Sequence, residues 1–558
     1  MRAAGPFMST ASRLRLRRSA AQLHALTHVE REIRAADPYG RRKYLREFND
    51  AFQAYEAVLD RQAYEQMLLA ADFVLVGDYH ALPKSQQFAA EVVERIAASG
   101  RQVVLGVECV FSRDQHILDD WQRGVTGERE LRERLRFDTA WGYDWQPFYR
   151  LLTRARQAGA LLYGLDATAR GDLRRISIRD RHAAERVGEI HASHPEAAVV
   201  VLFGESHLAP QHLPALIRAR VPRFDVLTVL QNVDALYWQA AGEPGEPVRT
   251  VRVRPGVVCA FTATPLEKYE SYRHCIERWK QERRGGPDYR PSFHGLIDAL
   301  AMFLNFDVFS ASTNSLTSCL YDTLPEVCSR GSIEQLRRVL KRRRASDEEV
   351  RAALGRLQRG GCAYVQRFNL LLVAQYDLAS AAEEAARFVQ TLQRGDVGKP
   401  PRELLSCEDR FYAACMDRAA AYVGSRILCP TRDAWHESDL FAEYARVADD
   451  DAPAPEAARM LDFVVLHRDY ECNARRYREV PELIVEGRHY SGEAFELATG
   501  WLGRLLGTQI YEAFLAGKLH KRYLRALLSR RFSRSAEAKT AYFKVARRTR
   551  ANRNQPLA

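Results

Sequence analysis

The sequence predicts an α/β fold, in which a mostly parallel sheet is flanked by helices, followed by a separate all-α domain. Within residues 71–282 short apolar runs alternate with helical patterns, which is typical of strands joined by crossover helices. From residue 292 onward the pattern is almost entirely helical. A chain of 558 residues also exceeds the usual size of one hydrophobic core, so two or three domains are expected.

Residues 1–70 are expected to form an N-terminal helical segment. The stretches LHALTHVEREI and YLREFNDAFQAYEAVLDRQAYEQMLLA place apolar residues three and four positions apart, as on one face of a helix. The basic start is not followed by the apolar core of a signal peptide, and no apolar run reaches the length of a membrane span, about 18 residues. The ten cysteines form no CxxC pair and are expected to be reduced. These features predict a cytoplasmic protein without a transmembrane segment.

The sheet of the α/β domain, residues 71–282, is expected to contain five apolar runs. These are FVLVG (73–77), VVLGVE (103–108), LLYGLD (161–166), VVVLFG (199–204) and FDVLTVLQN (224–232). A helical pattern separates each run from the next, which favours parallel pairing. The runs VRTVRVRPGVV and VCAFTATP are expected to add a second strand pair that closes the domain.

Three further segments complete the predicted organisation. RRGGPDYRP, residues 283–291, has the Gly, Pro and charge content of a linker. Residues 292–517 are expected to form a helical domain of unknown role, in which no repeat or chemical motif stands out. Residues 518–558 form a basic tail that accounts for nearly all of the net charge of +12.

The basic tail allows two interpretations. Aromatic residues are interleaved with its Lys and Arg residues, at Tyr523, Phe532, Tyr542 and Phe543. Such a stretch could contact the phosphates of a nucleic acid or an anionic membrane surface. The alternative is a basic helix that covers the helical domain. This alternative is favoured because a run of charge alone is a poor indicator of function.

Acidic and histidine side chains follow the strands of the predicted sheet. Asp78 and His80 end the first strand, Glu108 ends the second, and Glu205 and His207 follow the fourth. Because ligands of open α/β sheets bind outside the carboxyl ends of the strands, these groups are expected to meet in one crevice. The glycine of each GxxH turn, GDYH and GESH, lets the backbone turn sharply at the strand end.

The residue types in this set suit a transition-metal ion. Neutral imidazole is a ligand for iron, zinc and copper, whereas carboxylates suit manganese and magnesium. His80, His207, Glu108, Asp78 and Glu205 could therefore hold such an ion with positions open for water or substrate. A single histidine at a strand end is more often a surface or supporting residue, but two GxxH turns at matching strand ends favour a site.

In this order, the motifs resemble the ChaN-like haem-binding uptake family, within the Tiki, TraB and erythromycin-esterase superfamily. The matching residues are GDYH (77–80), GVE (106–108), RDRHAAERV (179–187) and GESH (204–207), within a region of resemblance from about 71 to 280. The first turn has Asp78 where the family more often has glutamate. No lipoprotein signal is visible, whereas ChaN-like members of uptake systems are typically exported.

The resemblance implies an α/β fold and a site at the two GxxH turns and the Glu108 strand end. His80, Glu108 and His207 are then the central residues, with His182 as a supporting residue. The cofactor would be haem or a divalent transition metal: iron, manganese or zinc. Since haem iron also accepts tyrosine as an axial ligand, Tyr79 is a further candidate.

Several functions remain open from the sequence. The first is binding of haem or a metal ion. The second is hydrolysis of an ester, lactone or peptide, in which a metal-bound water, or a water activated by His80 with Glu108 holding the imidazole, attacks the carbonyl, and His207 stabilises the developing charge. The third is an interaction module centred on the basic tail. The expected partners are haem or a small molecule, a second copy of the chain and, through the tail, nucleic acid or anionic membrane.

Overall fold

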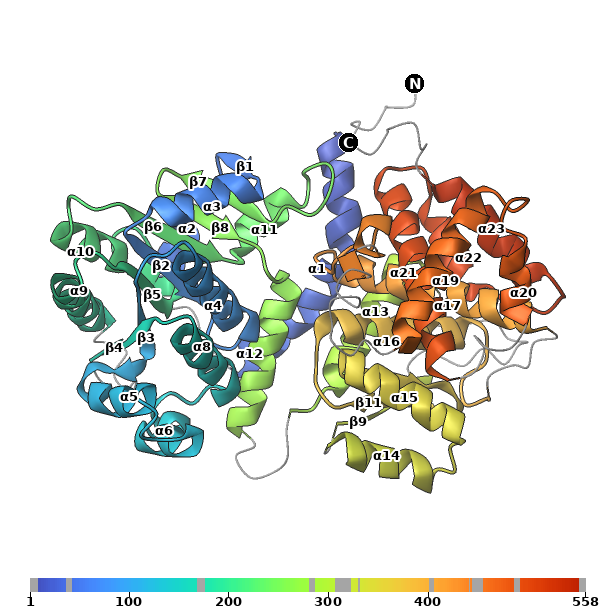
Figure 1. Ribbon diagram of the computed structural model, residues 1–558, viewed down its shortest axis with the longest axis horizontal. Helices are drawn as coiled ribbons and strands as arrows, with labels where there is room; N and C mark the ends of the chain where they lie inside the picture. The colour runs from blue at the N-terminus through green and yellow to red at the C-terminus, as the bar shows by residue number, and fades with distance from the viewer. Residues whose placement is uncertain are drawn as a thin grey trace. The chain divides into compact units, whose positions relative to one another are not determined.

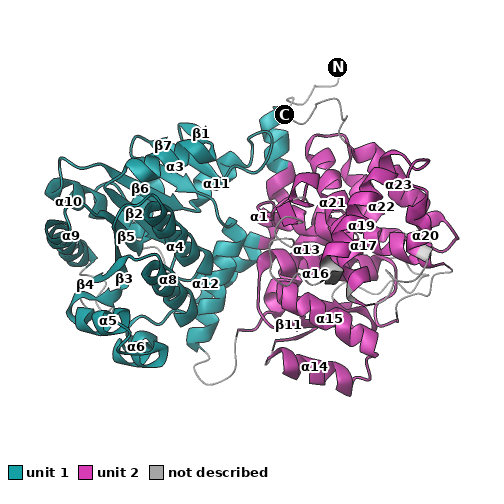
Figure 2. Cartoon of the chain, in the orientation of Figure 1, with its two compact units in different colours: residues 1–16, 26–284 teal, residues 17–25, 285–558 magenta. Residues whose placement is uncertain are grey.

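The computed structural model describes residues 9–36, 43–167, 176–280, 287–306, 323–329, 332–400, 406–440, 442–443, 455–485 and 492–550. The chain divides into two compact units (Figure 2). Unit 1 contains residues 1–16 and 26–284, and unit 2 contains residues 17–25 and 285–558. The predicted linker, residues 283–291, lies partly outside the described residues.

Unit 1 is built on an eight-stranded sheet with the order β1-β7-β8-β6-β2-β5-β3-β4 (Figure 1). Its strands are β1 (Ala57–Leu59), β2 (Phe73–Asp78), β3 (Val103–Phe111), β4 (Leu161–Asp166), β5 (Ala198–Gly204), β6 (Val226–Gln231), β7 (Thr250–Arg254) and β8 (Val257–Ala260). Strands β2, β3, β4, β5, β6 and β8 pair in parallel, and β7 pairs antiparallel with both β8 and β1. The predicted mostly parallel sheet is confirmed.

The sheet of unit 1 is covered by apolar side chains on both faces. Val74 and Val76 of β2 belong to one core, which includes residues of α4 (Pro83–Ala98) and α8 (Trp145–Gln157). Phe73 and Leu75, the alternate residues, belong to a second core with α9 (Ile176–Ser193), α10 (Leu213–Arg220) and α11 (Asp234–Ala240). Successive side chains of a strand point to opposite faces, so a strand buried on both faces is apolar throughout.

The N-terminal segment is helical except for one strand that the sequence analysis missed. Helices α1 (Thr10–Ala36), α2 (Lys43–Ala51) and α3 (Arg61–Ala70) lie where helices were predicted. Between α2 and α3, however, β1 joins the edge of the main sheet. The apparently continuous helical pattern is broken because Asp60 caps α3, with its carboxylate accepting a 2.7 Å hydrogen bond from the Ala63 amide.

Unit 2 is mainly helical, as predicted. The helices of its described residues beyond 286 are α13 (Arg290–Phe303), α14 (Ile333–Arg342), α15 (Asp347–Gly360), α16 (Leu378–Gln393), α17 (Cys407–Leu428), α19 (Pro455–Cys472), α20 (Glu479–Val485), α21 (Glu493–Leu515), α22 (Lys521–Ser529) and α23 (Glu537–Thr549) (Figure 1). The unit is not all-α, however. Strands β9 (Glu326–Cys328), β10 (Cys362–Val365) and β11 (Leu370–Val373) form a three-stranded sheet. Apolar runs this short do not distinguish a strand from a buried helix turn.

Glycines allow the two long helices α17 and α21 to pack closely. A β-carbon at Gly503 would lie 2.6 Å from Arg418 Cβ, and one at Gly507 would lie 2.8 Å from the Tyr422 ring. Such distances are below van der Waals contact, so larger residues at either position would push the helices apart.

The basic tail folds as helices α22 and α23 of unit 2. Phe532 and Tyr542 are buried, and the Tyr542 hydroxyl donates a 2.7 Å hydrogen bond to Glu471. These two aromatic rings therefore face the interior and cannot stack on an external partner. None of the helices among the described residues combines the length and apolarity needed to cross a bilayer. The nine described cysteines are all free thiols.

Unit 2 is expected to lose stability in acid through Glu471. Burial alone would raise the pKa of this carboxyl, but the hydrogen bond from His467 and the charge of Arg468 more than offset it and lower the pKa from 4.5 to about 2. A carboxyl with a depressed pKa in the folded state stabilises that state above its unfolded pKa, and this contribution disappears as the pH falls through the folded pKa. The expected loss is on the order of 3 kcal/mol between about pH 4.5 and 2.

Urea unfolding of unit 2 at a series of pH values, followed by hydrogen exchange in α17 and α23, measures this loss. The Glu471→Gln variant is the control, since it has no carboxyl to titrate and is expected to show a weaker pH dependence in this window. An equally steep dependence in the variant would contradict the assignment to Glu471.

Candidate functional site

The two GxxH turns lie side by side because their strands are neighbours. Strand β2 pairs with β5, and the last residues of the two strands, Asp78 and Gly204, are register partners. On the other side of β5, β3 carries Glu108 within an irregularity between Val107 and Phe111, where its pairing with β4 shifts register. Irregularities of this kind re-aim side chains at the edge of a sheet. The carboxyl ends of β2, β5 and β3 therefore deliver their polar residues to one place.

His80 is held by the carboxylate that ends its own strand. His80 Nδ1 lies 2.7 Å from Asp78 Oδ2, and Gln86 donates a hydrogen bond to the other oxygen of Asp78. The rings of Trp141 and Tyr143 pack against the imidazole, with centroids 4.7 and 5.1 Å away. Since an ionised carboxylate can only accept, Nδ1 carries the proton and Nε2 of a neutral ring keeps its lone pair.

His207 has the same arrangement with a different carboxylate. Its Nδ1 lies 2.5 Å from Asp180 Oδ1, on helix α9, and Tyr44 of α2 donates a 3.1 Å hydrogen bond to the other oxygen of Asp180. Burial and the charge of Asp180 raise the pKa of Tyr44, which keeps the phenol protonated as a donor. Nε2 of His207 is thereby left as the ring nitrogen that can bind a ligand or accept a proton.

Glu108 is held by an arginine and a backbone amide. Arg179 Nη2 lies 2.6 Å from Glu108 Oε1, and the Gly204 amide donates a 2.6 Å hydrogen bond to Glu108 Oε2. The same guanidinium makes two hydrogen bonds to Asp166, at the end of β4, of 2.8 and 2.7 Å. Burial would lower the pKa of Arg179, but Glu108 and Asp166 outweigh it and raise it. Arg179 is therefore a fixed cation between two carboxylates.

His80, Glu108 and His207 converge on Gly204. A β-carbon at this position would lie 3.2 Å from His80 Nε2, 3.2 Å from Glu108 Oε2 and 3.3 Å from His207 Cδ2. Only glycine leaves this space open without displacing a neighbour. These three residues are the central ones predicted from the sequence, and the structure brings them together.

Glu205 and Tyr79 lie beside this centre and contact Lys268 of α12 (Pro265–Lys280). Glu205 Oε1 is 3.1 Å from Lys268 Nζ, and that ammonium also lies 4.8 Å from the centre of the Tyr79 ring. Burial raises the pKa of Glu205, an effect that Lys268 offsets only in part. Burial also raises the pKa of Tyr79 well above its usual value, so this phenol stays neutral.

His182 faces a neighbouring part of the unit. Its Nε2 lies 2.8 Å from Ser112 Oγ, whereas Arg179 and Asp180 of the same helix reach the central residues.

The sequence carries one signal from which Arg179 and Asp180 could have been identified. Ala183, Ala184, Val187 and Ile190 form the buried face of α9, and Arg179 and Asp180 continue that face one turn earlier. Charged residues on a buried helix face must be paired.

The carboxylate that orients His80 also differs from the expectation. The sequence interpretation gave that role to Glu108, but Asp78 bonds His80 Nδ1, and Glu108 Oε2 is 3.7 Å from His80 Nε2. The shorter Asp78 side chain can do this because His80 follows it by only two residues. Glu108 stands on the opposite side of the ring, at the nitrogen that is not bonded to Asp78.

The charge of these residues fits a cation at the two imidazoles. With neutral imidazoles, four carboxylates face a single guanidinium, which leaves an excess of three negative charges; the carboxylates are Asp78, Glu108, Asp166 and Asp180. Among the described residues, the ligand atoms of His80, Glu108, His207, Asp78 and Glu205 include no three within 4.8 Å of one another. Each of the two imidazoles has a carboxylate behind it at Nδ1, an arrangement common for histidines that bind metals.

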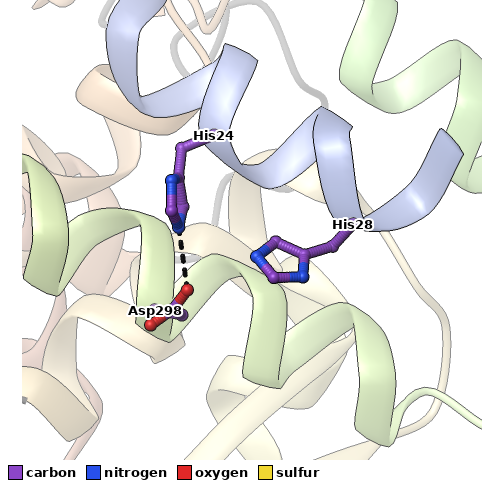
Figure 3. A group of neighbouring side chains, drawn as sticks. All are labelled: His24, His28 and Asp298. Atoms are coloured by element: carbon purple, nitrogen blue, oxygen red, sulfur yellow. Dashed lines mark hydrogen bonds and ion pairs between the residues drawn. The ribbon is translucent and has the colours of Figure 1, made fainter. Parts of the chain in front are cut away.

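A separate histidine–carboxylate pair lies in unit 2. His24 Nε2 is 2.8 Å from Asp298 Oδ2 of α13, and Figure 3 shows this hydrogen bond as a dashed line. The His24 side chain is 36% exposed. The pair links residues 17–25 of α1 to α13 within unit 2 and shares no residue with the site at Gly204.

Unit 1 is thus an α/β domain whose mostly parallel sheet is covered by helices on both faces. Two histidines, His80 and His207, follow the carboxyl ends of its central strands. Residues 65–177 match the family model described as "Haem-binding uptake, Tiki superfamily, ChaN". Over these residues the chain is similar to the ChaN-like family of that superfamily. The match includes His80 and Glu108, whereas Asp180, Gly204 and His207 lie beyond it.

Two solved structures show a distant likeness to this chain. One is titled "Cofacial heme binding to ChaN of Campylobacter jejuni"; it is 15% identical, the match covers 31% of this chain and 86% of that one, and the TM-score is 0.25. The other is the type III effector HopBA1, at 14% identity, with 38% of this chain and 96% of that chain covered and a TM-score of 0.26. A search of curated proteins finds no match.

Proposed function

We propose that unit 1 binds haem or a divalent transition-metal ion, iron, manganese or zinc, through Nε2 of His80 and Nε2 of His207. The match of residues 65–177 to a haem-binding family supports this proposal, and so does the excess of negative charge around the two imidazoles. Both rings have Nδ1 engaged by a carboxylate, which leaves Nε2 for the ligand.

The observation that carries the proposal is the position of His80 Nε2. This nitrogen lies 3.7 Å from Glu108 Oε2, and Nδ1 of the same ring is already bonded to Asp78. A neutral ring would therefore direct a lone pair towards a carboxylate, which is unfavourable in a buried site. A cation at Nε2, either a metal ion or a proton, removes the repulsion.

Each neighbour has a separate part in this proposal. Asp78 and Asp180 fix the tautomer and orientation of the two imidazoles, and Glu108 contributes negative charge beside His80. Arg179 keeps Glu108 in place. When bound, the iron or metal ion supplies a Lewis acid and, in the case of haem, redox chemistry.

Titration of the full chain distinguishes the two kinds of ligand. We expect either a Soret band that saturates with added haem or saturable heat on addition of Fe²⁺, Mn²⁺ or Zn²⁺. The His182→Ala variant should bind as the parent does, because His182 is bonded to Ser112 and not to the central residues. Failure of the parent to bind haem or any of the three ions would contradict the proposal.

Removing the orienting carboxylates is expected to weaken binding without removing the ligands. Asp78→Asn and Asp180→Asn each replace an acceptor of the imidazole N–H by an amide that can present its own N–H instead. Loss of such a supporting carboxylate typically costs about 10–100-fold in metal affinity. Calorimetry of each variant measures this change, with Asp60→Asn, at the cap of α3, as the matched substitution. Unchanged affinity in both variants would exclude the supporting role.

A second candidate function is hydrolysis of an ester, lactone or peptide. The 2.7 Å contact between Asp78 and His80 favours it, because a carboxylate that holds Nδ1–H leaves Nε2 to take a proton from water. Here His80 is the general base, and His207 stabilises the developing charge as an imidazolium that donates from Nε2, with its Nδ1–H held by Asp180. A panel of such substrates, assayed with and without added metal, tests this role. Turnover that persists in His80→Gln would contradict it.

A further inference from the structure

Unit 2 contains a cavity lined by an unusual number of arginines. It lies among helices α15, α16, α17 and α21 and the turn after α17. Trp501 forms part of the lining. The arginines that line it are Arg356, Arg359, Arg387, Arg418, Arg432 and Arg504.

Three glutamates in the lining compensate only part of this charge. Glu383 pairs with Arg432 at 2.6 Å and with Arg387 at 2.8 Å. Glu496 pairs with Arg418 at 2.7 Å. The third is Glu384. Six guanidinium groups against three carboxylates leave an excess of three positive charges around the cavity.

Glu384 is engaged in part by the backbone. Its Oε2 accepts a 2.7 Å hydrogen bond from the Tyr364 amide, and its Oε1 lies 3.2 Å from Arg387 Nε. Arg356 Nε is 3.5 Å from the same oxygen and, among the described residues, makes no hydrogen bond. Because a buried guanidinium nitrogen without an acceptor is costly, Arg356 has capacity for a further anionic partner.

Arg504 is the least compensated member of the group. Within the part of the chain that the structure describes, no carboxylate lies within 4.0 Å of its guanidinium, which instead lies 5.8 Å from the centre of the Trp435 ring. Burial lowers the pKa of Arg504, and so does the charge of Arg432. Burial likewise lowers the pKa of Arg356. For both arginines burial is the largest cause, and a neighbouring arginine adds to it.

We propose that this cavity binds a small molecule that carries an oligophosphate group. Planar guanidinium groups donate paired hydrogen bonds that match phosphate oxygens, and an oligophosphate supplies the several negative charges that the excess requires. Arg504 and Arg356 are expected to contact the ligand, while Arg418 and Arg432 remain held by their glutamates. This site lies within unit 2 and is independent of the site proposed at Gly204.

The rival interpretation is a purely structural ion-pair network. Such a network should contain roughly as many carboxylates as guanidinium groups, because an unpaired buried charge destabilises the fold. In that case removal of Arg504 would leave ligand binding unaffected. In the proposal, removal of Arg504 relieves repulsion between guanidinium groups and so stabilises the protein without ligand. The same change weakens ligand binding and so reduces the stabilisation that the ligand provides.

The test uses the full chain with inorganic diphosphate, inorganic triphosphate, ATP and citrate, with sodium chloride at matched ionic strength as the salt control. Thermal unfolding and calorimetry report binding. We expect the oligophosphates to raise the unfolding temperature more than the salt does. Equal affinity for triphosphate and ATP would assign recognition to the phosphates alone, whereas tighter binding of ATP would show that a nucleoside adds contacts. Citrate binding more tightly than diphosphate would overturn the assignment to phosphate.

Variants locate the binding. Arg504→Gln and Arg356→Gln are each expected to weaken oligophosphate binding by about 10-fold to 100-fold, the typical value of a hydrogen bond to a charged group. Without ligand, Arg504→Gln should unfold at the same or a higher temperature than the parent. The matched control is Arg338→Gln on α14, whose side chain is 68% exposed. Absence of oligophosphate binding in the parent, or parental affinity in both cavity variants, would overturn the proposal.

Discussion

Replacing Arg179 by methionine is expected to destabilise unit 1 by about 3–5 kcal/mol, the usual cost of removing one partner of a buried ion pair. Arg179 makes hydrogen bonds to both Glu108 and Asp166, and its side chain is only 9% exposed. Methionine fills similar space but leaves two buried carboxylates without their shared cation. Glu108 would also lose the contact that holds it beside Gly204, so binding at the two imidazoles should weaken as well.

Urea unfolding, followed by hydrogen exchange in β3, β4 and β5, measures this change. Additional Glu108→Gln and Asp166→Asn substitutions should restore part of the lost stability, because the carboxylates are then no longer charged. Arg129→Met is the control: Arg129 is 91% exposed and pairs with the exposed Glu133, so no measurable change is expected. If Arg179→Met lowered the free energy of unfolding by less than about 1 kcal/mol, this result would contradict the role assigned to Arg179 between Glu108 and Asp166.

The double variant His80→Ala/His207→Ala is expected to lose affinity for haem or metal by more than about 100-fold, since it removes both proposed direct ligands. Both imidazoles border the space at Gly204, and neither has Nε2 within hydrogen-bonding distance of a carboxylate among the described residues. Single variants should retain part of the affinity, because one imidazole and the surrounding negative charge remain.

A side chain that fills the space at Gly204 should cause a similar loss of affinity for haem or metal, although both histidines are still present. In Gly204→Val the new side chain would occupy the space between His80 Nε2, Glu108 Oε2 and His207 Cδ2. Thermal unfolding of each variant separates loss of binding from loss of folding. Parental affinity in the double histidine variant would place the ligand elsewhere.

The sequence was sufficient to predict the framework of unit 1 and the convergence of three side chains at one edge of its sheet. Strands β2 to β6 lie where apolar runs end in polar groups, and His80, Glu108 and His207 meet as the parallel arrangement requires. This prediction succeeded because neighbouring parallel strands necessarily bring their carboxyl ends to one edge of the sheet.

Partners that depend on three-dimensional packing could not be predicted. Arg179 and Asp180 come from a helix between β4 and β5, and their contacts with Glu108 and His207 depend on where that helix lies on the sheet. The arginine cavity of unit 2 is likewise assembled from four helices and a turn, none of which carries a motif. Strand β1 and the sheet of β9, β10 and β11 were missed because each strand is only three or four residues long.

Elemental analysis and a visible absorption spectrum of the freshly purified chain, compared with the His80→Ala/His207→Ala double variant, test the central claim most directly. The proposal predicts iron with a Soret band, or stoichiometric manganese, zinc or non-haem iron, in the parent and neither in the variant. An equal content of haem or metal in both proteins, or a parent that stays empty after incubation with haem and with each ion, would contradict it.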